Sequence, residues 1–296
     1  MQKDSYALGL VYTFLSAAFW GVSAACGQYL FMYKNISAEW LVSVRLLCSG
    51  FILFAIIFTK QKGKMFAIFK DFKALFWLGV YSIIGLLMCQ YTYYLTIQIS
   101  NAAIATVLQY TAPAFIMIYI ALRTKKMPKS REILALILAV SGVFLLATHG
   151  DLTSLNLPKK AIIIGLLSGV CVAIYSTSPV KINKKYGALT CLALGLIIAG
   201  VMSAFYTKFW TLNGVNDSSG FLALVGVIFF GTILAFGLYM LGLSILGPTK
   251  ASLIASVEPI SAGFFIYIWL GNRFVFMDYV GFALVLACAI LLTKRR

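Results

Sequence analysis

The stretch Gly247–Gly271 is apolar and long enough to cross a lipid bilayer, yet it carries a carboxylate and a proline side by side near its middle. Glu258, at the centre of an apolar helix, costs roughly 3 kcal/mol of insertion free energy. Pro259 lacks an N–H and frees the carbonyl of Ala255 from its bond within the helix. Lipid cannot satisfy such groups, so the break predicts a segment enclosed by other helices or facing a water-filled cavity.

Small residues surround this break and would let neighbouring helices approach closely. A polar, interrupted helix at mid-membrane is typical of a translocation site, and ionisable groups inside a membrane are usually functional. The alternative is a proline kink whose glutamate bonds to a neighbouring helix for packing only. Ser256, two residues before the glutamate, is a further candidate for substrate contact. The small residues are Ala251, Ser252, Ala255, Ser256, Ser261 and Ala262.

Composition makes this chain an integral membrane protein. Only 11% of its 296 residues are charged and 62% are hydrophobic, whereas a soluble domain is about 25% charged. The net charge of +16 resides in short loops between apolar runs, which is the positive-inside pattern and not a nucleic-acid-binding face. The expected partners are therefore a small-molecule substrate and anionic lipid on the cytoplasmic side; no nucleic acid is expected, and the oligomeric state is not determined.

Ten apolar runs reach the length that a membrane-spanning helix needs. If Met1 lies in the cytoplasm, the cytoplasmic loops receive 18 of the 24 basic residues and the opposite loops five. Because Lys and Arg accumulate on the cytoplasmic side, this ratio predicts an inner (plasma) membrane protein with both termini in the cytoplasm. The runs are residues 6–32, 38–59, 73–96, 100–122, 131–149, 161–180, 187–208, 220–243, 248–270 and 275–293.

The chain repeats itself at a separation of 146 residues. At that shift Pro113 falls on Pro259, each in the middle of a segment, and Glu132 falls on Asp278. Five segments make one half, and because five is odd the second half enters the membrane with the opposite orientation. The sequence thus predicts an all-α membrane fold of ten helices, in which residues 1–150 and 151–296 form two inverted five-helix repeats with the substrate site between them.

Segment four mirrors the opening stretch in shape but not in charge. Pro113 frees the carbonyl of Gln109, and Tyr110 adds a second polar group at the same depth. Where the mirror segment has Glu258, this one has Ala112. One carboxylate is therefore available for substrate binding or coupling. Gln109 and Tyr110 could line the substrate site or simply hydrogen-bond to neighbouring helices.

Three more side chains are candidates from their depth in the apolar runs. Arg45 could extend to the membrane surface, pair with Glu258 or Glu39, or bind a substrate carboxylate. Trp20 lies among small residues, and Tyr175 at a similar depth, so both could line a cavity, although buried aromatic residues most often serve packing. The sequence alone leaves these alternatives open.

The sequence gives little support for metal binding, for a cofactor or for enzymatic activity. The six cysteines all fall inside apolar runs without a C-x-x-C pair, and the single histidine, His149, reads as a residue at a segment boundary. No nucleotide-binding Gly-x-x-x-x-Gly-Lys motif occurs. An intramembrane enzyme would need paired His, Asp or Ser groups, whereas the charged groups expected inside the membrane are Glu258 and Arg45 alone. We therefore expect no metal and no cofactor.

Four stretches resemble helices of the drug/metabolite transporter superfamily, in its EamA-type ten-helix branch. ASLIASVEPISAGFFIYIWLGN (Ala251–Asn272) is similar to the signature helix of the second half, and LQYTAPAF (Leu108–Phe115) to its partner in the first. SVRLLCSGFIL (Ser43–Leu53) resembles the arginine-bearing second helix, and SAAFWG (Ser16–Gly21) resembles the first. The resemblance covers the whole chain but does not specify a substrate.

This resemblance implies two inverted halves around a cavity lined mainly by segments one, three, four, six, eight and nine, with five and ten at the periphery. Members move amino acids, other metabolites or drugs, mostly outward. Glu258, Pro259, Pro113 and Arg45 match the family pattern, whereas Asn272 stands where the family often has a glutamate. The expected function is thus export of small metabolites, amino acids first, by alternating access; the alternative is import of a quaternary amine such as choline or of another nutrient.

Overall fold

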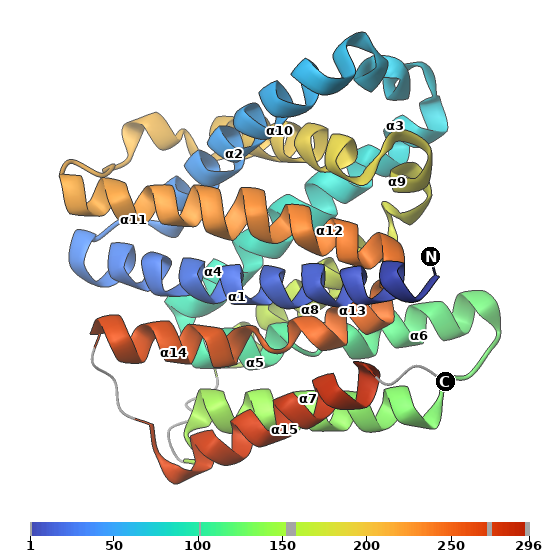
Figure 1. Ribbon diagram of the computed structural model, residues 1–296. Helices are drawn as coiled ribbons and strands as arrows, with labels where there is room; N and C mark the ends of the chain where they lie inside the picture. The colour runs from blue at the N-terminus through green and yellow to red at the C-terminus, as the bar shows by residue number, and fades with distance from the viewer. Residues whose placement is uncertain (1, 101, 152–157, 271–273, 294–296) are drawn as a thin grey trace.

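The computed structural model describes residues 2–100, 102–151, 158–270 and 274–293, and all regular structure in this part of the chain is helical (Figure 1). Within these residues, nine helical runs are long and apolar enough to cross a membrane. The remaining predicted segment, the ninth (residues 248–270), consists of two shorter helices separated by a break. The predicted all-α membrane fold is therefore confirmed, although the ninth segment does not form one continuous spanning helix.

The first half contains seven α-helices, a 3₁₀ turn η1 and a π-helical turn η2 that joins α3 to α4. They are α1 (Gln2–Lys34), α2 (Ala38–Gln61), η1 (Lys62–Lys70), α3 (Phe72–Gly79), η2 (Val80–Leu87), α4 (Met88–Ile99), α5 (Ala102–Gln109), α6 (Ala112–Thr124) and α7 (Ser130–Thr148).

The second half contains eight α-helices, a 3₁₀ turn η3 and a π-helical turn η4 that joins α11 to α12. They are α8 (Lys159–Thr177), α9 (Val180–Tyr186), α10 (Ala188–Thr207), η3 (Phe209–Thr211), α11 (Ser218–Ile228), η4 (Phe229–Leu234), α12 (Ala235–Leu246), α13 (Pro248–Ala255), α14 (Glu258–Leu270) and α15 (Phe276–Thr293).

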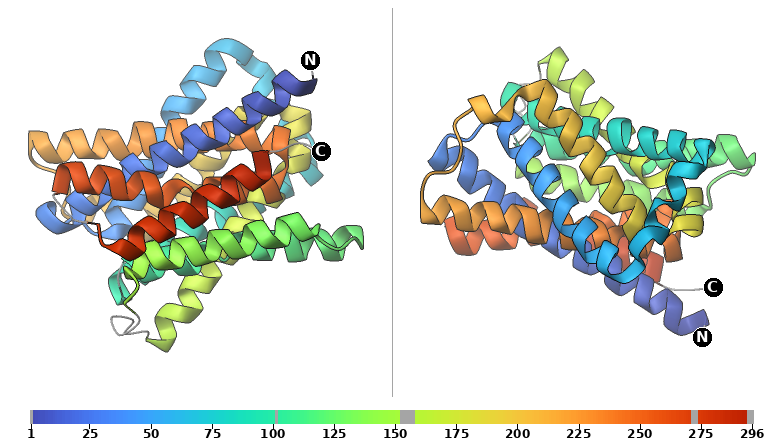
Figure 2. Two further views of the ribbon diagram at one scale, coloured as in Figure 1. Left: turned by 60° about the horizontal axis from the view of Figure 1, so that its bottom comes forward. Right: turned by 90° about the horizontal axis from the view of Figure 1, so that it is seen from above.

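The two broken segments have the same boundaries once 146 is added to the residue number. Residue 102 begins α5 and residue 248 begins α13, while residue 112 begins α6 and residue 258 begins α14. The pair α5–α6 runs towards the end of the bundle that holds both chain termini, and α13–α14 runs away from it (Figure 1). Figure 2 shows the termini at that common end from two further sides. Matched breaks of opposite direction are what the predicted repeat requires, and the division at residue 150 stays a prediction.

The packing of the helices also corresponds between the two halves when each helix is replaced by its counterpart in the other half. The most extensive contacts join α2 to α10, α7 to α15, α1 to α12, α1 to α14 and α4 to α8. Exchanging the halves turns α1–α12 into α8–α4, and it turns α1–α14 into the smaller contact α8–α6. Between α2 and α10 the backbones touch: a Cβ added to Gly200 would lie 2.7 Å from the Leu47 nitrogen, and one added to Gly50 would lie 2.8 Å from the Ile197 nitrogen. Glycine is needed there because no side chain fits between the helices.

Ion pairs at the two ends of the bundle also correspond between the halves. Asp71, the N-cap of α3, accepts a hydrogen bond from Lys185 at 2.6 Å, and Asp217, the N-cap of α11, accepts one from Lys34 at 2.6 Å. The two aspartates are 146 residues apart. Each lysine holds the pKa of its aspartate below the ordinary value. Their stabilising contribution is therefore present above the ordinary aspartate pKa and is lost as the pH falls through the lowered one.

The close contact of α2 with α10 predicts that alanine at Gly200 is destabilising, whereas alanine at a helical glycine without close neighbours should be stabilising. Gly200→Ala should lower the free energy of unfolding, because overpacking costs about 1–3 kcal/mol. Gly79→Ala is the control: nothing lies within 4 Å of its added Cβ, and alanine in a helix should stabilise by about 0.5–1 kcal/mol. Thermal unfolding in detergent measures both. Shifts of the same sign and size would contradict this contact.

Candidate functional site

A cavity of about 610 Å³ lies between the two halves. Residues of α1, α2, α4, α5, α7, α8, α12, α14 and α15 line it. It extends from Trp20 and Glu258 in the middle of the bundle to Met32 and His149 at helix ends remote from both termini. Segments five and ten, α7 and α15, were expected at the periphery but contribute the mouth of the cavity, because their ends converge there.

Glu258 is the first residue of α14, and its half-buried side chain lines this cavity. The Tyr110 hydroxyl donates a hydrogen bond to Glu258 Oε2 at 2.8 Å and lies 3.2 Å from the Ala255 carbonyl oxygen. That carbonyl is the one that Pro259 frees. Tyr110 stands at the break of the first half, whereas its two partners stand at the break of the second. A single phenol therefore ties the two interrupted segments together.

The prolines begin new helices, which differs from a kink within a continuous one. Pro113 is the second residue of α6 and Pro259 the second of α14. Proline is tolerated in a first helical turn because its missing N–H would have no intrahelical partner there. Just before each proline, Thr111 and Val257 donate their N–H to the carbonyl three residues earlier, at 3.3 and 3.2 Å. Both breaks are thus tight 3₁₀-type turns with the same geometry.

Four aromatic rings form one wall beside Glu258. The ring centroid of Trp20 lies 5.1 Å from that of Phe236, nearly edge-on, and 5.2 Å from that of Tyr239. Tyr175 packs against the same two rings at 5.9 Å each. Trp20, Tyr175 and Phe236 all line the cavity. The sequence pointed to the first two; it gave no signal for Phe236, one of 23 phenylalanines.

Gln109 lies on the cavity wall, but Ser256 does not. The Gln109 amide donates to Ser168 Oγ at 2.7 Å, so it both lines the cavity and bonds to α8. Ser256 is fully buried, and its hydroxyl donates to the Leu253 carbonyl at 2.6 Å, within its own segment. It is absent from the walls of the described cavities. The contact of Ser256 with substrate stays a prediction that this placement does not support.

Arg45 is buried on the wall of the same cavity, with 5% of its surface exposed. Its guanidinium donates to the Tyr94 hydroxyl at 2.8 Å, to Thr232 Oγ1 at 3.1 Å and to the Gly231 carbonyl at 3.4 Å. Within the described residues it forms no ion pair, either with Glu258 or with Glu39. It therefore neither extends to the membrane surface nor neutralises Glu258 directly.

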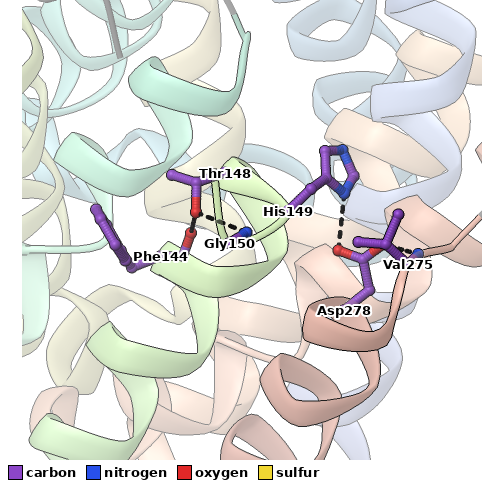
Figure 3. A network of polar contacts seen from close by, with 6 residues as sticks. All are labelled: Phe144, Thr148, His149, Gly150, Val275 and Asp278. Atoms are coloured by element: carbon purple, nitrogen blue, oxygen red, sulfur yellow. Dashed lines mark hydrogen bonds and ion pairs between the residues drawn. The ribbon is translucent and has the colours of Figure 1, made fainter. Parts of the chain in front are cut away.

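At the mouth, His149 and Asp278 join α7 to α15 (Figure 3). Asp278 is 1% exposed, and its carboxylate lies 2.8 Å from His149 Nδ1 and accepts the Val275 N–H at 2.8 Å. Sequence reasoning placed His149 at a segment boundary and did not include Asp278 in the site. The available signal was the repeat, since Glu132 caps α7 through the corresponding backbone N–H, at 3.0 Å.

Both halves of the chain match a known family of transporters. A sequence model of the EamA-like transporter family matches residues 7–148 and again residues 159–294. The chain is 34% identical over 287 residues to the uncharacterized inner membrane transporter YicL of Salmonella typhimurium, covering 96% of this chain and 95% of that one. It is 26% identical over 209 residues to the threonine/homoserine exporter RhtA of Salmonella typhimurium, covering 70% and 68%.

A solved crystal structure shares the fold. It matches with a TM-score of 0.81 and covers 96% of this chain and 95% of its own, at 13% sequence identity. At that sequence identity, the similarity is evidence for the arrangement of the helices alone.

The Tyr110 bridge predicts a loss of stability when its hydroxyl is removed. Tyr110→Phe keeps the ring but leaves the Glu258 carboxylate and the Ala255 carbonyl without this donor, which should cost about 1–3 kcal/mol. Tyr119→Phe, on α6, removes a hydroxyl whose partner is the exposed Arg123 and should change stability by less than about 0.5 kcal/mol. Thermal unfolding in detergent compares them, and equal small effects would mean that the bridge between the breaks is unimportant.

Proposed function

Since the chain belongs to the EamA-like transporter family, we propose that it is a secondary active transporter that exports small organic metabolites, amino acids or related compounds, by alternating access. One observation carries the proposal: the half-buried Glu258 carboxylate faces a cavity of about 610 Å³ at the junction of two broken helices. A family of transporters moves its substrates and does not convert them. We place the protein in the inner membrane, where YicL is named, with both termini in the cytoplasm.

The cavity has the properties that a small polar solute requires. Its volume falls within the range of about 300–1,000 Å³ of ligand sites. Glu258 would hold a substrate amine or a proton, and Trp20, Tyr175 and Phe236 would enclose the apolar part. Gln109 and the Tyr110–Glu258 pair would set the orientation. The name of RhtA, a threonine/homoserine exporter, supports amino acids as the first class to test.

Alternating access also requires a closed route on the other side, and the repeat indicates where it lies. At the 146-residue shift, Phe282 and Leu146 on the outer cavity wall correspond to Leu136 and Leu292. These two belong to a packed apolar cluster near the end with the termini, where the Tyr6 hydroxyl donates to the Leu292 carbonyl at 2.8 Å. Equivalent side chains thus line a cavity at one end and are packed in an apolar cluster at the other. We propose that this inner cluster separates when the outer cavity closes.

This proposal predicts a change of access at one position of the inner cluster. In a variant without native cysteines, Leu136→Cys should react slowly with a membrane-impermeant maleimide from the cytoplasmic side, and at least about fivefold faster when a mixture of the twenty amino acids is present. Ala24→Cys, on the outer cavity wall, is the control and should react from the outer side and become slower. A Leu136→Cys rate that does not respond to any solute would contradict inner opening.

Glu258 as the coupling or amine-binding group predicts a loss of transport when its charge is removed. Glu258→Gln should lower amino acid counterflow in proteoliposomes at least tenfold and abolish its dependence on pH, because the amide cannot gain or lose a proton at these pH values. Glu132→Gln removes an acid that caps α7 and does not line the described cavities. It should leave counterflow within twofold. Intact pH-dependent flux in Glu258→Gln would show that this carboxylate is not the coupling group.

A second candidate function rests on the aromatic wall. Trp20, Phe236 and Tyr239 stand together beside a carboxylate, and aromatic faces with a nearby anion can hold a quaternary ammonium group. Import of a choline-like compound would use this wall without needing a cationic residue. The rings face one another edge-on or tilted, so part of their surface is already used in packing. The two functions differ in one requirement: an amino acid carries a carboxylate, and choline does not.

A further inference from the structure

Arg45 is a buried cation for which the described protein supplies only neutral partners. The guanidinium stays protonated in proteins and has five N–H donors. Three of them are engaged, by the Tyr94 hydroxyl, the Thr232 hydroxyl and the Gly231 carbonyl. Two donors remain, on a residue that lines the cavity between the halves. Within the described residues, Arg45 thus has no ion pair in contact and has hydrogen-bonding capacity left at the cavity.

Such an arrangement is costly unless an anion completes it. A buried charge without an ionic partner costs several kcal/mol, even after the surroundings relax. The two acids on the same cavity wall do not contact Arg45: Asp278 bonds to His149 and to the Val275 N–H, and Glu258 accepts from the neutral Tyr110 hydroxyl. A purely structural role would be served better by an apolar or neutral polar residue of similar size.

The packing of α2 on its counterpart α10 does not require this charge. Helix α2 packs along α10, its counterpart in the second half, and α10 (Ala188–Thr207) contains no charged residue. The packing of the pair therefore works with a neutral helix in the equivalent position. The π-helical turn η4, in contrast, supplies two of the three acceptors, Gly231 O and Thr232 Oγ1, and π-helical turns often mark functional sites.

We propose that Arg45 binds the carboxylate of the transported substrate, so that the substrate is a zwitterion with a free carboxylate and an amine. This inference rests on the proposed transport function and narrows its substrate class. The planar guanidinium can donate two parallel hydrogen bonds to a carboxylate, and two donors are free. Glu258, on the wall of the same cavity, provides the complementary charge for an amine. A dianionic phosphate fits less well, because Glu258 and Asp278 also line the cavity.

The test compares each amino acid with its own carboxamide, which keeps the amine but has no carboxylate. The twenty amino acids, their amides and choline are screened for binding to the purified protein by thermal shift and then by competition in proteoliposome counterflow. The wild type should bind at least one amino acid, with at least tenfold lower affinity for its amide and no binding of choline. In Arg45→Gln the affinity for the acid should fall to that for the amide, a ratio of about one.

Three further variants keep the test decisive if Arg45→Gln does not fold. Arg45→Lys retains the charge but loses the two-pronged geometry, so the acid-to-amide ratio should fall to an intermediate value. Tyr94→Phe and Thr232→Val each remove one neutral partner of the guanidinium and should reduce the ratio while counterflow continues. Arg123→Gln, an exposed arginine on α6, is the matched control and should leave the ratio unchanged.

The outcomes separate the two claims. Transport of amino acids with equal affinity for acid and amide, or an unchanged ratio in Arg45→Gln or Arg45→Lys, would overturn the role of Arg45 and leave the transport proposal standing. Binding of choline in preference to every amino acid would overturn the zwitterion inference and favour the second candidate function. Absence of binding and counterflow for all amino acids would overturn the amino acid proposal itself, and with it this inference.

Discussion

A helix that stops halfway across a membrane leaves amide and carbonyl groups that lipid cannot hydrogen-bond, so each break must be satisfied within the protein or at a water-filled cavity. The described part of this chain has two such breaks, and their free backbone groups are satisfied together. The N–H groups of Thr111 and Val257 donate to carbonyls within their own segments. The Tyr110 hydroxyl lies within hydrogen-bond distance of the Ala255 carbonyl and the Glu258 carboxylate at the opposite break. The cavity, the aromatic wall and the matched interfaces of the two halves are arranged around this junction.

The two halves share their geometry but differ in chemistry, and that difference gives the cavity its character. Ala112 occupies the position that Glu258 holds in the second half, and α10 has no counterpart of Arg45. The protein thus places two acids from the second half, Glu258 and Asp278, and one cation from the first, Arg45, on the wall of a single cavity. Within the described residues Arg45 forms no ion pair with either acid. A symmetric frame allows the halves to exchange roles during transport, and the unequal side chains give the solute one preferred orientation.

The positions of the breaks could be predicted from the sequence, because Pro113 and Pro259 act on the backbone next to them. That Glu258 lines a cavity also followed, since a carboxylate in lipid requires an enclosed environment. The partners of Arg45 could not be predicted, because they lie on α4 and η4, far along the chain, and depend on how the helices rotate against each other. The direction of the Ser256 hydroxyl could not be predicted for a similar reason: polarity does not show which way a hydroxyl points, and this one bonds back to Leu253. The pair His149–Asp278 was missed because the two residues are 129 positions apart in the chain, and only the repeat pointed to Asp278.

The central claim is that the Glu258 carboxylate faces the path of the transported solute. The most direct measurement is labelling of membrane carboxyl groups with a hydrophobic carbodiimide, followed by mass spectrometry of the modified peptides, with and without saturating amino acids. The account predicts that Glu258 is modified and that a transported amino acid protects it at least fivefold. No modification of Glu258, or modification that no solute slows, would contradict it.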